Sequence, residues 1–261
     1  MSYIRKYIDD INKKSRKALS IFLTAGFPSK NNFVELAKNV FDAGADMIEI
    51  GVPFSDPLAD GPVIQASSKI ALDSSVNLKD VLIYSGEIAN HSSKPIILMG
   101  YANPIMKYGT KKFFSDARQA GVRGLIVPDV PLEEYDSFFE EQPVGIDVIL
   151  LTTPTSSDER IKSIDEKSEG FVYCVSVVGT TGIKNNFGSD TLNNLKRTYS
   201  LLIKNKMMIG FGISKPEDVK TFSPYCDGVI VGSRIMKSLL DNDNLDDTLA
   251  VISSLSSACK E

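Results

Sequence analysis

Short apolar runs alternate along the chain with longer segments in which apolar residues recur at helical spacing. The runs are typical of strands buried on both faces, and the longer segments are typical of amphipathic helices. The predicted strands are 19–24, 47–50, 96–99, 124–127, 148–151, 171–175, 208–211 and 228–231. The predicted helices are 3–15, 33–41, 63–71, 78–89, 111–120, 132–140, 158–166, 191–203, 216–222, one that begins at 234, and 245–258.

Strands that alternate with helices predict a parallel sheet. Eight such units in 261 residues predict one domain over residues 1–261, a (β/α)₈ TIM barrel with an extra N-terminal helix. A doubly wound sheet is the alternative, but it predicts a G-x-G-x-x-G turn after an early strand, which the chain lacks. The connections after the second and sixth strands are long. In a barrel, such loops can close over substrate, although insertion without function is the alternative.

One stretch, residues 49–65, joins a strand end to a loop rich in proline and acid. Glu49 shares a strand face with Met47, while Ile48 and Ile50 share the other. A carboxylate in an apolar strand is costly unless it is paired or used, so a structural ion pair is the alternative to catalysis. Asp60 lies at the end of the loop, where glycine and proline give a rigid frame. Two carboxylates placed in this way can divide acid and base work if their pKa values differ.

Composition excludes several classes of function. The net charge of −4 gives no basic surface for nucleic acid. His91 is the only histidine and lies in a polar turn, which excludes a site of several histidine ligands and gives no support to a Ser-His-Asp triad. The three cysteines lack metal or redox spacing, and Cys174 is expected in the core. No signal-peptide core or run of about 18 apolar residues is present, so we expect a cytoplasmic chain that binds no membrane.

The last two strands each end in small residues, as Gly210-Phe211-Gly212 and Gly232-Ser233. In barrels, the loops after strands seven and eight and a short helix often hold a phosphate. Bare backbone and helix-start amides bind phosphate without lysine, and Gly182 in the sixth loop is expected to add another amide. The alternative is that these glycines only mark tight turns.

Further short motifs occur where predicted strands end. They are Leu23-Thr24-Ala25-Gly26, Gly100-Tyr101-Ala102-Asn103-Pro104, Pro128-Asp129-Val130-Pro131, Gly210-Phe211-Gly212-Ile213-Ser214 and Val231-Gly232-Ser233. With residues 49–65 they cover nearly the whole chain, which closely resembles the tryptophan synthase alpha subunit family. The resemblance implies cleavage of indole-3-glycerol phosphate to indole and glyceraldehyde 3-phosphate, with Glu49 and Asp60 as the catalytic carboxylates. It also implies an indole pocket lined by Phe22, Met99, Tyr101, Leu151, Tyr173, Thr181 and Phe211. At each of these positions the alternative is ordinary core packing.

The resemblance implies a retro-aldol cleavage in which Glu49 transfers protons and Asp60 binds the indole nitrogen. The histidine count argues against a metal aldolase. A Schiff-base aldolase needs a desolvated lysine, whereas Lys94 and Lys206 precede their strands. The sixth loop departs from the family, since Val177 stands where arginine is frequent.

Two competing functions remain. Another phosphate-binding barrel enzyme, such as an indole-glycerol-phosphate synthase or a sugar-phosphate isomerase, does not account for the loop from Pro53 to Pro62. A regulatory subunit that only activates its partner does not account for Glu49 and Asp60, although Val177 leaves it open.

The resemblance also implies a partner, a tryptophan synthase beta subunit in an α₂β₂ assembly that receives the indole. Pyridoxal phosphate is expected on that subunit, and neither cofactor nor metal on this chain. The residues expected at the partner interface lie after the second and third strands, on strand-end loops: Pro53, Asp56, Asn103 and Pro104.

Overall fold

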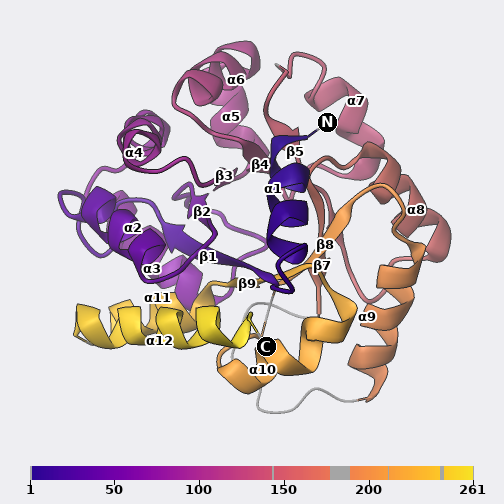
Figure 1. The fold of residues 1–261 in the computed structure, drawn as a ribbon. Coiled ribbons are helices and arrows are strands. Elements are labelled where there is room, and N and C mark those ends of the chain that lie inside the picture. The colour runs from indigo at the N-terminus through magenta and orange to yellow at the C-terminus, as the bar shows by residue number, and fades with distance from the viewer. Residues whose placement is uncertain (1, 143, 177–188, 211, 242–243, 261) are drawn as a thin grey trace.

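The computed structural model describes residues 2–142, 144–176, 189–210, 212–241 and 244–260. Helices and strands alternate along this part of the chain (Figure 1). The strands are β1 Ala18–Thr24, β2 Met47–Gly51, β3 Ile96–Met99, β4 Gly124–Ile126, β5 Asp147–Val148, β6 Leu151–Thr152, β7 Phe171–Val175, β8 Lys206–Gly210 and β9 Gly228–Val231. The helices are α1 Tyr3–Asn12, α2 Phe33–Asp42, α3 Pro62–Asp73, α4 Leu78–His91, α5 Ala102–Tyr108, α6 Thr110–Gln119, α7 Tyr135–Phe138, α8 Asp158–Lys167, α9 Ser189–Leu201, α10 Pro216–Phe222, α11 Ser233–Leu240 and α12 Leu245–Ala258, with 3₁₀ turns at Leu132–Glu134 and Ser223–Tyr225.

All the pairings between strands are parallel, in the order β5-β4-β3-β2-β1-β9-β8-β7-β6. The two ends of this order, β5 and β6, are halves of the fifth predicted strand. Between them, the amide of Ile149 donates to the carbonyl of Leu125 at 2.9 Å, and the carbonyl of Leu150 accepts from the amide of Tyr173 at 2.9 Å. The segment therefore bonds to β4 on one side and β7 on the other, which closes the sheet into a barrel.

The side chains of the strands divide into an interior and an outer set. Met47 packs inside the barrel with Ile97, Ile126 and Met208, whereas Ile48 and Ile50 belong to the larger core between strands and surrounding helices. This is the alternation expected of a strand with two buried faces. Glu49 has the same parity as Met47 and thus faces the interior.

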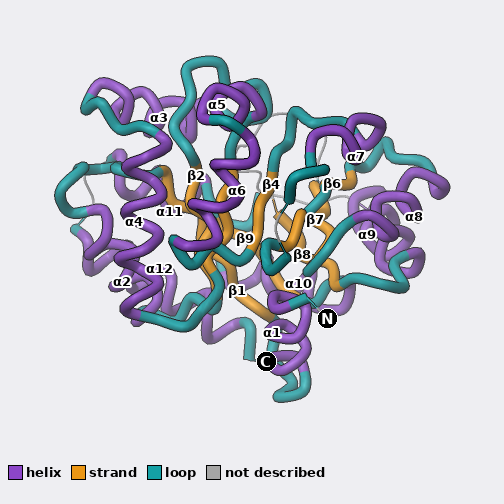
Figure 2. The backbone as a smooth tube through the Cα atoms, turned by 90° about the horizontal axis from the view of Figure 1, so that it is seen from above, coloured by secondary structure: helices purple, strands orange, loops and turns teal. Residues whose placement is uncertain are grey.

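Helix α1 covers the end of the barrel where the strands begin (Figures 1 and 2). Its apolar stripe of Ile4, Ile8 and Ile11 is buried in the same cluster as the interior residues of the strands. A Cβ atom at Gly124 would lie only 2.7 Å from Cδ1 of Ile4, so this glycine admits the helix. Because α1 covers this end of the barrel, a ligand site can form only at the other end, where the strands have their carboxyl ends.

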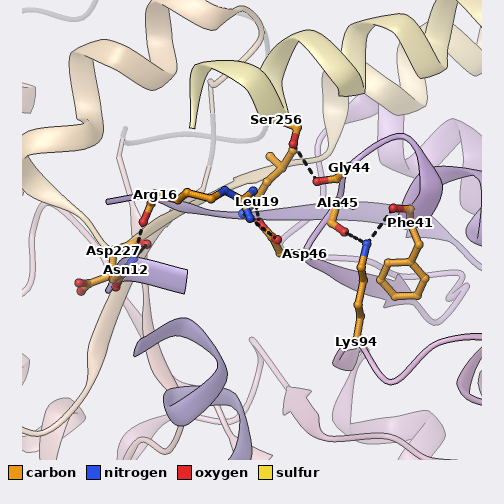
Figure 3. Close-up of polar contacts among 10 residues, drawn as sticks. All are labelled: Asn12, Arg16, Leu19, Phe41, Gly44, Ala45, Asp46, Lys94, Asp227 and Ser256. Atoms are coloured by element: carbon orange, nitrogen blue, oxygen red, sulfur yellow. Dashed lines mark hydrogen bonds and ion pairs between the residues drawn. The ribbon is translucent and has the colours of Figure 1, made fainter. Parts of the chain in front are cut away.

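A polar network holds the elements together at the end that α1 covers (Figure 3). Arg16 forms a bidentate ion pair with Asp46, with both N–O distances at 3.1 Å, and Asp46 also accepts from the amide of Leu19 at 3.0 Å. Nζ of Lys94 donates to the carbonyls of Phe41 and Ala45, both at 2.8 Å, where α2 ends. Lys94 and Lys206 thus lie away from the carboxyl ends of the strands, as predicted, since Lys206 pairs with Asp9 of α1.

The structure corrects three predicted elements. The fifth strand, expected at 148–151, is divided into β5 and β6 because its middle residues change hydrogen-bonding partners. The helix expected at 132–140 is a 3₁₀ turn followed by α7, which ends at Phe138. Helix α5, Ala102–Tyr108, was not predicted, and it places Asn103 and Pro104 in its first turn rather than on a loop.

Candidate active site

Glu49 lies on β2 with no exposed surface, and Oε1 of its carboxyl group accepts a hydrogen bond from the Ser20 hydroxyl at 3.1 Å. Oε2 is buried and has no partner among the described residues. Burial raises the pKa of Glu49 from 4.5 to about 8, because the charged form loses its hydration, while the Ser20 hydrogen bond acts in the opposite direction. Glu49 forms no ion pair with a described basic side chain. The alternative of a structural ion pair is therefore wrong for the described residues.

Asp60 ends the connection of residues 52–61 between β2 and α3. Its carboxyl group is half-buried, which raises its pKa from 3.8 to about 6, and a hydrogen bond with the Tyr101 hydroxyl partly offsets this effect. The same hydroxyl accepts from the amide of Ala59 at 3.1 Å. Asp60 is held further by its carbonyl, which accepts from the side chain of Gln65 at 2.8 Å. The loop therefore fixes a second carboxyl group near the carboxyl end of β2.

Two glycines leave space for aromatic rings inside the barrel. A Cβ atom at Gly51 would lie 2.3 Å from the ring of Phe22, and one at Gly210 would lie 2.1 Å from the Tyr173 hydroxyl oxygen. Gly210, predicted to bind phosphate, thus has a packing role: it admits Tyr173. The Tyr173 ring is buried, and its pKa is raised well above its usual value by burial and by the charges of Glu49 and Asp60.

Several residues predicted for the indole pocket are described and lie on strands. Their positions are on the interior face of the barrel. Phe22, Met99, Leu151 and Tyr173 alternate along their strands with residues that face the surrounding helices, although Phe22 also packs in the larger core. Tyr101 follows β3, and its ring is tilted against that of Phe54 with 5.2 Å between the ring centroids. A cavity of about 500 Å³ at the ends of β4, β6 and β7 is lined by Leu151 and by Ala59 next to Asp60, but not by Glu49, Asp60 or the other described residues predicted for the indole pocket.

Apart from Gly210, the described residues predicted for the phosphate site lie in backbone turns. Gly212 has a φ of +84°, a conformation that favours glycine. Gly232 caps α11 without a side chain, so Ser233 begins the helix with amides turned toward its N-terminal end. These two turns follow β8 and β9 at the same end of the barrel as Asp60. Thr181 and Phe211 of the predicted pocket, Gly182 of the phosphate site and Val177 lie outside the described residues.

The four residues predicted for a partner interface line one cavity of about 740 Å³. Pro53 and Asp56 come from the loop after β2, and Asn103 and Pro104 from the first turn of α5. Three exposed lysines, Lys79, Lys107 and Lys112, also line it. The structure thus brings these residues together on an open surface beside the predicted site.

Sequence reasoning missed two residues that organise the site. One is Ser20. The signal that could have identified it is that it is polar in an otherwise apolar strand and shares a strand face with Phe22. The other is Asp129, whose carboxylate accepts from the amide of Ala102 at 3.0 Å and caps α5 from the loop after β4. Among the described residues no His, Cys, Asp and Glu cluster could hold a metal ion, and no described helix is long and apolar enough to cross a membrane.

Comparison with known proteins gives consistent matches over the full length. The family model described as "Tryptophan synthase alpha chain" matches residues 8–260. The tryptophan synthase alpha chain of Thermoanaerobacter pseudethanolicus is 40% identical over 262 aligned positions, which cover 100% of this chain and 99% of that one. A solved chain of Mycobacterium tuberculosis tryptophan synthase has a TM-score of 0.90 at 30% identity, covering 100% of this chain and 99% of the other. Tryptophan synthase subunit alpha from Legionella pneumophila has a TM-score of 0.87 at 34% identity, covering 99% and 98%.

Proposed function

The chain belongs to the tryptophan synthase alpha chain family, and from this premise we propose that Glu49 and Asp60 carry its lyase reaction. That reaction cleaves indole-3-glycerol phosphate to indole and glyceraldehyde 3-phosphate. The observation that supports these roles is that two carboxyl groups at the mouth of the barrel have different pKa values, about 8 for Glu49 and about 6 for Asp60. A pair with separated pKa values can divide acid and electrostatic work.

Glu49 is protonated near pH 7 and so begins as the acid. Its proton moves to carbon 3 of the indole ring, which makes the ring a leaving group. The resulting carboxylate takes the proton from the neighbouring side-chain hydroxyl, the carbon–carbon bond breaks, and its electron pair returns to the indole. One aldehyde forms, and Glu49 regains its proton. The chemistry balances with one carboxyl group acting as acid and then as base.

Asp60 is mostly ionised at the same pH and stabilises charge. Protonation of carbon 3 places positive charge on the indole ring nitrogen, and a carboxylate that accepts the N–H bond stabilises it. The hydrogen bonds to Tyr101 and Gln65 keep the Asp60 loop in place while that charge develops. Phe22, Met99, Leu151 and Tyr173 form the apolar walls, and the turns at Gly212, Gly232 and Ser233 hold the phosphate.

The substitution Glu49→Gln tests this assignment. It keeps the shape and removes the acidic proton, so we expect kcat for indole release to fall by about 10²–10⁴-fold. Glu87→Gln, on the exposed face of α4, is the matched control and should leave kcat unchanged. Stimulation of a beta subunit by the Glu49→Gln chain should persist, which would show that the chain is folded. Turnover that survives Glu49→Gln would remove Glu49 from its role.

We propose further that a beta subunit docks on the surface formed by Pro53, Asp56, Asn103 and Pro104, in an α₂β₂ assembly, and receives the indole. The support is that these residues line one open cavity next to the Asp60 loop. Pyridoxal phosphate belongs to the beta subunit in this proposal, and this chain works without a cofactor.

A further inference from the structure

Ser20 is the one described side chain that forms a hydrogen bond with Glu49, and this contact has a consequence for catalysis. The serine lies on β1 with no exposed surface, in the row of interior residues that includes Phe22. Its hydroxyl donates to Oε1 of Glu49 at 3.1 Å across adjacent strands. The strands are parallel, with Ser20 paired to Met47 and Phe22 paired to Glu49, so the Ser20–Glu49 contact is diagonal and backbone pairing fixes both side chains.

The two oxygens of Glu49 are therefore in different environments. Oε1 accepts from Ser20, and the buried Oε2 has no partner among the described residues. A neutral carboxyl group has one O–H donor and one carbonyl acceptor. Because Oε1 already accepts, the proton belongs on Oε2. A buried polar atom without a partner requires an explanation, and a bound substrate supplies one.

We propose that Ser20 is a positioning residue that selects Oε2 of Glu49 as the oxygen that carries and transfers the proton. This inference rests on the proposed role of Glu49 and goes beyond it, since it assigns a function to a β1 residue and distinguishes two oxygens of one group. Ser20 keeps the carboxyl plane and its acidic hydrogen in one orientation, so that the proton is ready for transfer when the substrate arrives.

The groups that face Glu49 agree with this assignment. Tyr173 on β7 is near enough for the charge of Glu49 to raise its pKa, and the strand partner of Glu49 on β3 is the apolar Ile97. No described lysine, arginine or histidine contributes to the pKa of Glu49. Of the described contacts, only the Ser20 hydroxyl stabilises the ionised form of Glu49 against the effect of burial.

The experiment compares Ser20→Ala, Ser20→Thr and Ser20→Cys with the unchanged chain. The first readout is a ¹³C NMR titration of chain labelled at the glutamate side-chain carboxyl carbon, with Glu49→Gln identifying the Glu49 signal. We expect Ser20→Ala to raise the pKa of Glu49, because the hydrogen bond that favours its charged form is lost. Ser20→Thr should restore the pKa, and Ser20→Cys, a weaker donor, should lie between.

The second readout is the pH dependence of cleavage. We expect Ser20→Ala to lower kcat by about tenfold with little change in KM, and to move the limb of the pH profile that belongs to Glu49 to higher pH. Ser85→Ala is the matched control, since Ser85 is a fully buried serine on α4 that donates to the carbonyl of Val81. It should move neither the titration nor the profile.

The outcomes separate this inference from the proposed function. If Ser20→Ala leaves the Glu49 titration and the pH profile unchanged while Glu49→Gln is inactive, the role of Ser20 is wrong and that of Glu49 stands. If Glu49→Gln remains active, the role of Glu49 is wrong whatever Ser20→Ala does. Loss of kcat in Ser20→Thr as large as in Ser20→Ala would also overturn the inference, because the hydroxyl group would then not be what matters.

Discussion

Glu49 and Asp60 carry the same functional group, but their surroundings give them different proton affinities. Glu49 is fully buried with one hydroxyl partner, and Asp60 is half-buried beside Tyr101. Because the raised pKa of Glu49 comes first from burial, it also makes the free energy of unfolding depend on pH.

The dependence can be predicted with its sign. Between pH 4.5 and about 8 the folded chain keeps a proton on Glu49 that the unfolded chain releases. Stability from this group is full below pH 4.5 and is lost as pH rises toward 8. Glu49→Gln removes the pH dependence that comes from this group. As the unchanged chain loses stability between pH 4.5 and about 8, the free energy of unfolding of the variant should therefore rise relative to it by a few kcal/mol, on the order expected for a buried carboxyl group. Urea unfolding at several pH values measures it, and a constant difference would contradict the buried state of Glu49.

A second prediction concerns the phosphate turn. Ser233→Asp places a carboxylate at the first residue of α11, where it favours the helix, yet it repels a bound phosphate. We expect weaker binding of glyceraldehyde 3-phosphate by about tenfold or more, unchanged binding of indole, and no loss of thermal stability. Ser233→Asn, which lacks the charge, is the control. Equal losses for both ligands, measured by calorimetry, would place the phosphate elsewhere.

The sequence indicated the two candidate carboxyl groups but not the residue that contacts one of them. Glu49 and Asp60 follow from their type and position in residues 49–65. The contact of Ser20 with Glu49 depends on the register of β1 against β2, and local spacing does not give register. Gly210 shows the opposite case, since its role in admitting Tyr173 depends on a residue 37 positions away in a neighbouring strand.

At the scale of elements, α1 completes the core of the barrel. Ile8 is fully buried against the interior cluster, so Ile8→Ala should lower the free energy of unfolding by about 2–5 kcal/mol. Ile83→Ala on α4, where the side chain is 58% exposed, is the control and should cost within about 0.5 kcal/mol. Denaturant unfolding compares the two. Similar small losses would show that α1 does not contribute to the core.

Most helices and strands were predicted because their faces are apolar at the correct period. Helix α5 was missed because Asn103-Pro104 is typical of a turn. The structure accommodates Pro104 in the first helical turn, where its missing N–H needs no partner. The cap of the helix is the carboxylate of Asp129, 27 residues away, and a cap supplied by another loop leaves no local signal. The division of the fifth strand also leaves no local signal, because it comes from a change of hydrogen-bonding partner from β4 to β7.

In the whole molecule, the two ends of the barrel have separate tasks. The polar network of Arg16, Asp46 and Lys94 lies where the strands begin, and the carboxyl groups of the candidate site lie toward their other end. In barrels, the first end serves stability and the second chemistry.

This separation predicts the effect of Lys94→Met. The substitution removes two charge-assisted hydrogen bonds and should lower the free energy of unfolding by about 1–3 kcal/mol. We expect kcat/KM for indole release to stay within about twofold, because the change is at the opposite end from the site. Lys162→Met on the exposed face of α8 is the control for stability. A large loss of kcat/KM in the folded Lys94→Met chain would show that the two ends are coupled.

The position of α1 also has a consequence for how the molecule is assembled. The helix precedes in sequence all the strands it covers, and its docking site includes residues from Ala18 to Ile230, among them Met208 on β8. During synthesis, Ile4, Ile8 and Ile11 therefore have no complete surface to cover until β9 has been made. The ten residues of α1 thus reach their final burial only after β9 has been made, and the opening they cover stays accessible to water until then.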